Sequence, residues 1–352
     1  MSTSATADLR LARLRLGWVV AGVAAVALAL TISVAVGPVS IGVGSLAGEL
    51  TRHLPIIGTG RGLTAQQATI VWELRLPRVV LALLVGAMLA SAGATYQGVF
   101  RNPLADPYLL GAAAGAGLAV TFVLVAAPGL AGRGLSPLPI AAFGGALVAV
   151  LLAYALGRAA GGRSAATLLL AGVAVASFLT AVQTYVQQQH VDTIRQVYSW
   201  ILGRLTTAGW SEVLLVLPYF LVTTAVLLAH RRVLDVLAVG DTEASTLGVP
   251  TARTRLVIVA TASLATAAAV SVSGLIGFVG IIVPHTVRLV AGASYRVILP
   301  LSLLFGAAFL AFADLAARTL AAPSEIPIGV ITAFVGAPFF VLVLRTSREA
   351  PA

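Results

Sequence analysis

Cysteine and lysine are both absent from the 352 residues, and only 10% of the chain is charged. Without cysteine there can be no disulfide and no thiolate metal site. Without lysine there is no phosphate-binding loop of the GxxxxGK[ST] type, no Schiff-base lysine and no lysine general base. Any ATP-driven activity would therefore need an ATPase on another chain. Soluble domains carry about 25% charged residues, so the composition also excludes an ordinary soluble protein.

Apolar residues make up most of the chain: 59% of the residues are hydrophobic, and the mean hydropathy is +1.02. A stretch of about 17 to 25 apolar residues crosses a bilayer as a helix. Such runs, separated by polar and Pro/Gly breaks, predict an all-α polytopic membrane protein with about ten spans. The first run is too long for a signal-peptide core and is predicted to be retained. The predicted spans lie near 17–37, 74–98, 107–127, 139–157, 165–188, 212–230, 254–274, 284–293, 297–320 and 327–345.

The eighth predicted span is short, and Gly274, Gly277, Gly280 and Pro284 interrupt the approach to it. Irregular backbone at membrane depth is tolerated only inside protein or beside a water-filled cavity. This segment is therefore expected in the interior of the helix bundle.

The arginines set the expected orientation. With the N-terminus inside, 14 of the 22 arginines fall on the cytoplasmic side, in keeping with the positive-inside rule. Both termini are then cytoplasmic. The expected division is a tail at 1–16, one permease domain at 17–345 with a cytoplasmic loop at 231–253, and a tail at 346–352.

Several motifs occur in a fixed order between about Glu73 and Leu344. They are Leu74–Arg78 (LRLPR), Gln97–Pro107 (QGVFRNPLADP), Gly274–Gly280 (GLIGFVG) followed by Pro284 and His285, Ala313–Asp314, and Glu325–Val330 (EIPIGV). Together they resemble the iron-siderophore/cobalamin permease family of binding-protein-dependent ABC importers. The resemblance marks as family-motif or pathway residues Arg101, Asn102, Pro103, Gly277, Gly280, Pro284 and His285.

The resemblance implies a type II ABC importer permease fold of ten helices, in the bacterial cytoplasmic membrane, that dimerises with a second copy or a paralogue around a central path. It further implies two separate ATPase subunits inside, an extracytoplasmic substrate-binding protein outside, and no enzymatic activity or cofactor of the permease's own, since ATP is bound by the partner subunits. A ferric siderophore is the first expectation for the substrate, and haem and cobalamin are the alternatives.

The loop between the sixth and seventh spans resembles the family's coupling segment, two short helices that fit a cleft of the ATPase. Acidic residues suit the first turn of a helix and glycine can end one. An ordinary capped surface helix is the alternative. The residues concerned are Gly240, Asp241, Glu243, Ala244, Leu247 and Gly248, with Ala244 and Leu247 expected on one apolar face.

Three arginines are candidates for docking the binding protein. Arg75 and Arg78 share a helix face at i and i+3, and Arg318 lies at the same outer end. In the resembling family such arginines meet acidic residues of the binding protein; snorkelling to lipid headgroups is the alternative. Asp314 is the acid placed deepest in a span. It is expected to be structural, paired with Arg318 at i,i+4, and a proton-coupling acid is the other interpretation.

The remaining polar candidates are a histidine and two glutamines. His285 alone, with no second histidine or sulfur ligand nearby, is a poor metal site, so a packing role is favoured over iron or haem ligation. Gln183 and Gln187 either line the outer pathway or mark the membrane exit. Residues 52–67 lengthen the first outer loop beyond the family pattern.

Two other classes of protein fit the sequence less well. An ion-coupled secondary transporter would need several embedded acids or a sodium site, and Asp314 is the one available acid. An intramembrane enzyme would need paired carboxylates, a Ser/His pair or a metal cluster, and the sequence shows none at a suitable spacing.

Overall fold

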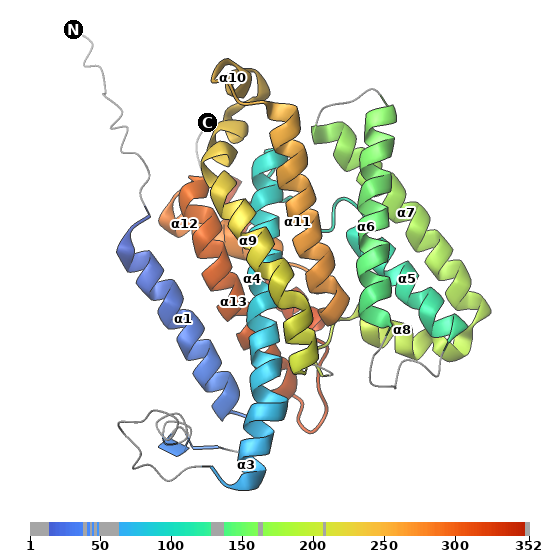
Figure 1. The fold of residues 1–352 in the computed structure, drawn as a ribbon, viewed down its shortest axis with the longest axis vertical. Helices are drawn as coiled ribbons and strands as arrows, with labels where there is room; N and C mark the ends of the chain where they lie inside the picture. Colours follow the sequence, from blue (N-terminus) through green and yellow to red (C-terminus); the bar gives the residue numbers. More distant parts are fainter. Residues whose placement is uncertain are drawn as a thin grey trace.

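The computed structural model describes residues 14–37, 41–42, 44–45, 48, 63–127, 137–160, 165–206 and 209–348, and every described element is a helix (Figure 1). The long helices are α1 (Leu16–Ala35), α4 (Leu76–Phe100), α6 (Leu138–Ala159), α7 (Ala165–Gln189), α9 (Trp210–Val239), α11 (Thr251–Ser273), α13 (Tyr295–Thr319) and α14 (Ile328–Arg348). The shorter ones are α3 (Ala65–Thr69), the π-helix η1 (Ile70–Arg75), α5 (Ala112–Ala126), the 3-10 turn η3 (Val191–Thr193), α8 (Ile194–Ile201), α10 (Asp241–Thr246) and α12 (Val279–Ala291).

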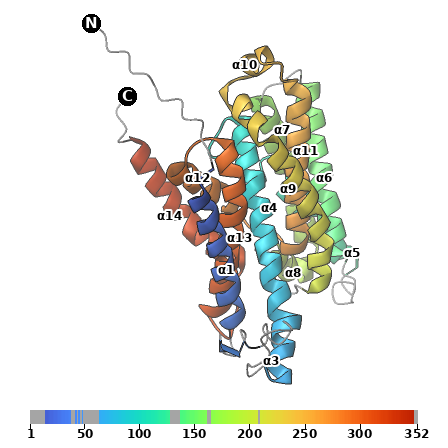
Figure 2. The same ribbon diagram turned by 60° about the vertical axis from the view of Figure 1, so that its left-hand side comes forward.

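Ten of these helices correspond one to one with the ten predicted spans. Within the described residues, seven helices are long and apolar enough to cross a membrane, and three shorter apolar helices, α5, α12 and α14, complete the set. α10 and α3 lie at opposite ends of the bundle, which we call the α10 end and the α3 end (Figures 1 and 2).

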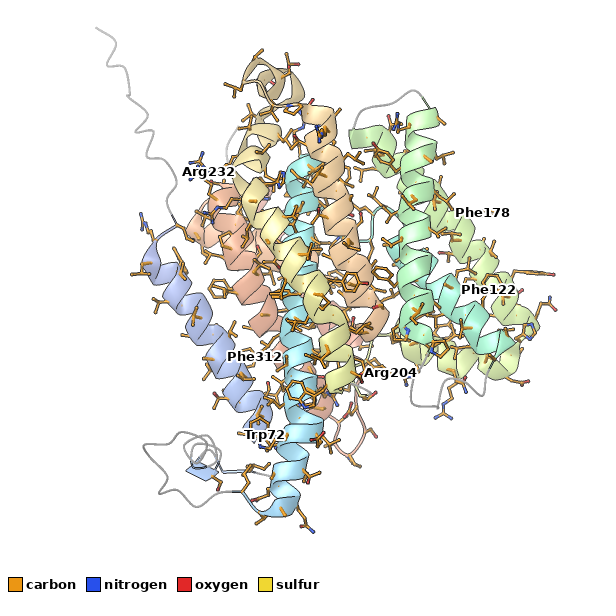
Figure 3. The ribbon with its side chains drawn as sticks, in the orientation of Figure 1. Trp72, Phe122, Phe178, Arg204, Arg232 and Phe312 are labelled. Carbon is orange, nitrogen blue, oxygen red and sulfur yellow. The ribbon has the colours of Figure 1, made fainter. Side chains whose placement is uncertain are left out.

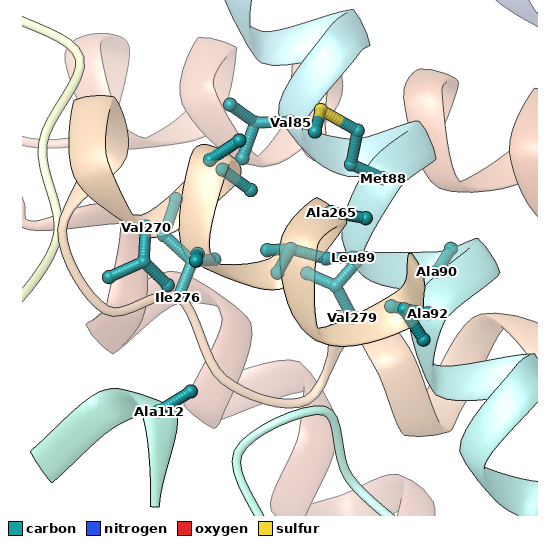
Figure 4. Close-up of a cluster of buried hydrophobic side chains, with 14 of the residues drawn as sticks. Val85, Met88, Leu89, Ala90, Ala92, Ala112, Ala265, Val270, Ile276 and Val279 are labelled. Carbon is teal, nitrogen blue, oxygen red and sulfur yellow. The ribbon is translucent and has the colours of Figure 1, made fainter. Parts of the chain in front are cut away.

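α4 is the central helix of the bundle. It packs against α9, α11, α12 and α13, and α1 covers α13 on the outside (Figure 2). Aliphatic side chains of α4 such as Val85, Met88 and Leu89 meet Val270 of α11 and Val279 of α12 (Figure 4). Because lipid is as apolar as these side chains, close packing rather than water exclusion holds such helices together.

Glycine allows the closest approaches to α4. A Cβ on Gly93 would lie 1.9 Å from the Gly280 carbonyl oxygen of α12, and one on Gly86 would lie 2.3 Å from the Gly306 carbonyl oxygen of α13. Larger residues at these crossings would push the backbones apart. The packing of α12 and α13 on α4 therefore depends on small residues at two depths of the bundle.

The second span begins well before the predicted residue 74. α3, η1 and α4 form one helical run of 36 residues, Ala65–Phe100. At 1.5 Å per residue this run is about 54 Å long, more than the roughly 30 Å of a hydrocarbon core. It projects from the bundle at the α3 end (Figure 1). Thr64 starts the run with a capping box to Gln67, so part of the expected loop 52–67 is helical, and residues 52–62 lie outside the described residues.

The third predicted span, 107–127, is shorter in the structure. α5 begins at Ala112, because residues 101–111 form turns that return into the bundle. Its 15 residues cover about 22 Å, less than a full hydrocarbon core. The expected interior position of the 274–280 segment is confirmed, since its irregular backbone before α12 includes the buried Ile276.

Sequence reasoning missed α8, which lies in the predicted connection between the fifth and sixth spans. This eight-residue helix buries Val197 and Trp200 on one face and exposes Arg195, Gln196 and Tyr198 on the other. Such a two-sided helix at the α3 end is typical of an element that lies across the bundle surface.

Candidate functional site

At the α3 end, a buried carboxylate connects the second, ninth and tenth predicted spans. Asp314 of α13 is fully buried and accepts hydrogen bonds from Nε and Nη2 of Arg78, at 3.0 and 2.8 Å to Oδ1. Arg78 also donates to both carboxylate oxygens of Glu325, at 2.9 and 3.0 Å. A bidentate guanidinium–carboxylate pair is among the strongest polar contacts in proteins. This network joins α4, α13 and the segment that leads into α14.

Arg318 extends the network to α1. Its Nε lies 3.6 Å from Asp314 Oδ2, which confirms the expected i,i+4 pair, and its Nη2 donates to the carbonyl oxygen of Ser33. Arg75 donates to the carbonyls of Val34 and Ala35, at 2.8 and 3.1 Å. The last carbonyls of a helix have no partner within the helix. Arg75 and Arg318 therefore cap the C-terminus of α1.

The three candidate docking arginines thus have partners within this chain. Arg75 and Arg318 are each 6% exposed, and the Arg78 side chain is 13% exposed. The i,i+3 spacing of Arg75 and Arg78 predicts a shared helix face, but the two side chains reach different partners. Arg75 ends the π-helix η1 and donates to the end of α1, whereas Arg78 donates to Asp314. Docking by these residues stays a prediction, and the role that their contacts show is internal.

The 101–107 and 274–280 motifs, far apart in the sequence, meet inside the bundle. The Tyr108 hydroxyl donates to the Ile276 carbonyl and accepts from the Ile276 amide, both at 3.1 Å. A Cβ on Gly280 would lie 2.5 Å from Pro107 Cδ. Gln97 of α4 donates to the Gly280 carbonyl at 3.2 Å. The two motifs therefore form one packed junction between α4, α5 and α12.

The start of the 101–107 motif ends α4 at the α10 end. Arg101 adopts the left-handed conformation (φ 52°) as the C-cap, and the Asn102 amide donates to the Gln97 carbonyl at 3.2 Å. The Asn102 side chain accepts from the Leu104 amide at 2.9 Å, and Pro103 is exposed. These contacts explain the motif as a chain reversal that returns the backbone to the bundle.

Asp106 is the one carboxylate of that reversal. Its Oδ1 accepts from the Tyr108 amide at 2.7 Å, and burial raises the pKa of Asp106 from 3.8 to about 6. Its side chain retains some contact with solvent. Ionised Asp106 is thus less stable here than in water, because the hydrogen bond only partly offsets desolvation.

His285 lies in α12 one residue after the buried Pro284. Its ring packs edge-on against Phe339 of α14 at 5.7 Å between centroids. No group of three or more His, Cys, Asp or Glu residues gathers around any point within the described ranges. The contact favours the packing role over metal ligation. Gly277, in the irregular segment before α12, has open space where a Cβ would stand.

The segment predicted to couple to an ATPase forms the tip of the bundle at the α10 end (Figure 1). α10 begins directly after Gly240, and Gly248 (φ +80°) ends it, as predicted. Of the two short helices expected, the described residues contain one, α10. The expected shared apolar face is wrong: Ala244 is fully buried against the protein, whereas Leu247, which follows the last helical residue of α10, is 71% exposed.

Gln183 and Gln187 of α7 are both buried, at 7% and 9% exposure. Gln183 packs against α5, since a Cβ on Gly117 would lie 2.9 Å from its Oε1. Their role in lining a pathway stays a prediction, and the structure shows them between helices instead.

α7 also exposes a stripe of polar side chains, which was not predicted from the sequence as a set. Thr180, Thr184 and Gln188 are all exposed, and their i, i+4, i+8 spacing places them on one face of the helix. Phe178 is exposed on a different side of α7 and points away from the bundle (Figure 3). The spacing of Thr180, Thr184 and Gln188 is visible in the sequence, but the sequence does not show which side of α7 is exposed.

The comparisons with known proteins agree with the resemblance of the motifs. Residues 25–346 match the model of the FecCD transport family. The cobalamin import system permease protein BtuC of Halobacterium salinarum is 46% identical over 83% of this chain and 77% of its own length. The hemin transport system permease protein HmuU of Yersinia pestis is 40% identical over 79% of this chain and 84% of its own.

A solved structure supports the fold over nearly the whole chain. The inward-facing conformation of a metal-chelate type ABC transporter superposes with a TM-score of 0.80 and 27% identity, covering 93% of this chain and 98% of that one. With ten apolar helices among its described residues and with these similarities, the chain belongs to the FecCD transport family and is a multi-pass membrane permease of ABC importers.

Proposed function

We propose that this permease is the membrane-spanning subunit of an importer for a ferric siderophore, delivered by an extracytoplasmic binding protein and driven by two separate ATPase subunits. The observation that carries the proposal is the similarity over 93% of this chain to a metal-chelate type ABC transporter. The absence of lysine supports a separate ATPase, because this chain has no phosphate-binding lysine.

The α10 end faces the cytoplasm and the α3 end faces outside in this proposal, with both termini cytoplasmic and the chain in the cytoplasmic membrane. The division of the arginines that the sequence predicts, 14 inside and eight outside, supports this orientation. Leu247 supports it as well, because a large apolar side chain that is 71% exposed at the bundle tip suits a cleft in an ATPase. The domain boundaries remain those proposed from the sequence: tails at 1–16 and 346–352, and one permease domain between them.

Two permease chains, identical or paralogous, would enclose the path. We assign its wall to the Thr180, Thr184 and Gln188 stripe of α7. Polar side chains of a membrane-spanning helix are normally turned toward protein or water rather than toward lipid. A wall of hydroxyl and amide groups without charge suits a large chelate that must not bind tightly. Specificity would then reside mainly in the binding protein.

The chain's lack of cysteine makes this assignment easy to test. A single cysteine in place of Thr184 should react with a membrane-impermeant maleimide in the assembled transporter. Phe178→Cys is the matched control, because Phe178 is equally part of α7 but faces another direction (Figure 3). Equal reactivity of the two variants, or reaction at Phe178→Cys alone, would remove the stripe from the path.

Cobalamin is the second candidate substrate, because a relative 46% identical over most of this chain is named as a cobalamin permease. Haem is the third, on the hemin permease of Yersinia pestis. An ion-coupled transporter is disfavoured, because Asp314 is held between two arginines and has no freedom to carry a proton. Uptake of ⁵⁵Fe-loaded siderophore by cells that express the complete transporter, competed with unlabelled cobalamin or hemin, separates the substrates. Uptake that ionophores abolish while ATP remains would contradict the proposal.

A further inference from the structure

The last turns of α9 lead directly into α10 at the tip of the bundle (Figure 1). α9 ends at Val239 and α10 begins at Asp241, so only Gly240 lies between the two helices. Ala244 of α10 is fully buried, and α10 packs on α9 and α11. Because the connection is one residue long and α10 is packed against the bundle, a displacement of α10 acts first on the end of α9.

Asp235, about one turn before the end of α9, holds the N-terminus of α13. Its Oδ1 accepts from the Tyr295 amide, and its Oδ2 accepts from the Ser294 hydroxyl at 2.8 Å. The Nε of Arg296 lies 3.3 Å from the same Oδ2. The first amides of a helix have no partner within the helix, and the helix dipole favours a negative charge beside them. Asp235 therefore caps α13 from another helix and joins the ends of α9 and α13.

Tyr295 continues this connection from α13 to α12 and α4. Its hydroxyl accepts from Arg288 Nη2 of α12 at 3.0 Å, and the same nitrogen donates to Gln97 Oε1 of α4 at 3.2 Å. Gln97 in turn donates to the Gly280 carbonyl near the start of α12. The Tyr295 ring lies against α4, since a Cβ on Gly98 would lie 2.9 Å from its Cζ. Tyr295 and Gln97 are 5% and 1% exposed, so these contacts are shielded from water.

Packing alone does not reach α12 from α9. Among the described helices, α9 packs mainly on α4, α11 and α13, whereas α12 packs on α4 and α13. The polar contacts that start at Asp235 supply the missing connection, and they end at Gly280, where a Cβ on Gly93 of α4 would lie 1.9 Å from the carbonyl oxygen. Coupling between distant sites is carried by contiguous chains of packed side chains and hydrogen bonds of this kind.

We infer that Asp235 is a positioning residue for transport: through it, the ends of α9, α13, α12 and α4 move as one unit when α10 is displaced. This role rests on the proposed function, in which α10 contacts an ATPase subunit, and it deepens that function by naming the contacts that pass the movement into the permease. Hydrogen bonds to a carboxylate are about twice as strong as those between neutral groups. Asp235 is therefore the contact whose loss should separate α9 from the other three helices.

The first test measures uptake per ATP hydrolysed in proteoliposomes that hold the complete transporter, with ⁵⁵Fe-loaded siderophore on the binding protein that supports wild-type uptake. Asp235→Ala should lower this ratio about fivefold or more, the size of a typical coupling between sites, while ATP hydrolysis continues. Tyr295→Phe removes one hydroxyl and should lower it about twofold. Tyr96→Phe is the matched control and should leave it unchanged, because the Tyr96 hydroxyl also bonds to another helix, at 2.6 Å from Ser263 Oγ, but lies outside the chain of contacts.

The second test restores the connection covalently, since the permease has no cysteine of its own. Asp235→Cys combined with Ser294→Cys should be uncoupled when reduced. It should recover most of the wild-type ratio once a short bifunctional thiol reagent joins the two positions. Asp235→Cys alone, treated in the same way, should stay uncoupled.

Three results would overturn the inference. Asp235→Ala with the wild-type ratio would leave the carboxylate a purely structural cap. Equal losses in Tyr295→Phe and Tyr96→Phe would show that any buried hydroxyl matters, and this comparison holds even where Asp235→Ala does not assemble. A cross-linked transporter that hydrolyses ATP without import would show that α9 and α13 must separate. Each of these refutes only this inference, whereas a wild-type complex that imports no siderophore refutes the proposed function.

Discussion

Replacing Asp314 by asparagine is the most informative change to the ion-pair network at the α3 end. Asp314 is fully buried and is shared by Arg78 and Arg318. Removing one partner of a buried ion pair typically costs about 3–5 kcal/mol, because the other charge is left without compensation. Arg78 keeps Glu325 and Arg318 keeps the Ser33 carbonyl in the variant. We therefore expect a loss at the lower end of this range, about 3 kcal/mol.

The assay is equilibrium unfolding of the purified permease by titration with a denaturing detergent. Asp192→Asn makes the same chemical change at an exposed position near the same end of the bundle, and should alter the free energy of unfolding by less than about 0.5 kcal/mol. Glu325→Gln should fall between them, near 1 kcal/mol, because Glu325 is 37% exposed and its pair is solvated. If Asp314→Asn were no worse than Asp192→Asn, the network would not hold α4, α13 and α1 together.

Three further changes test the junction and the bundle tip. Gly93→Ala should cost about 1–3 kcal/mol in the same unfolding assay, because its Cβ would lie 1.9 Å from a carbonyl oxygen, whereas Gly144→Ala, with nothing within 4 Å, should be neutral or slightly stabilising. The pKa of Asp106 is raised to about 6, so the stability that protonated Asp106 contributes is fully present below about pH 4 and is lost as the pH rises through 6. The loss should be smaller than the ~3 kcal/mol that such a shift gives for a fully buried group. Asp106→Asn should abolish this loss, and a variant whose stability falls between pH 4 and pH 7 as much as that of wild type would contradict the assignment. Leu247→Asp should leave the unfolding free energy within about 0.5 kcal/mol of wild type and sharply reduce uptake per ATP hydrolysed, and coupled uptake at the wild-type ratio would remove Leu247 from the ATPase contact.

The helices were largely predictable because lipid imposes a strong constraint on sequence. Each span needs a long apolar run, and Pro, Gly and arginine mark where runs end, so all ten spans were placed. α5 was predicted too long because residues 107–111 are as apolar as the helix that follows, although Pro107 packs against Gly280 and Tyr108 bonds to Ile276. α8 was missed because a short two-sided helix has no long apolar run.

The partners of polar side chains were less predictable than the helices. The sequence places Arg75, Arg78 and Arg318 at one end of the bundle, but it does not show that Asp314 and the last carbonyls of α1 are within reach. Those contacts depend on how α1, α4 and α13 pack. In the same way, Gln183 and Thr184 are neighbours in sequence, and only the position of α5 decides which of them is buried.

The central claim, that this permease forms the path and a separate ATPase drives transport, is tested most directly in proteoliposomes. Vesicles that hold the permease alone should not accumulate chelate against its gradient, with or without ATP. Vesicles that also hold the ATPase subunits should accumulate it when given ATP and the loaded binding protein, in the presence of ionophores. Accumulation by the permease alone, driven by an ion gradient, would contradict the account.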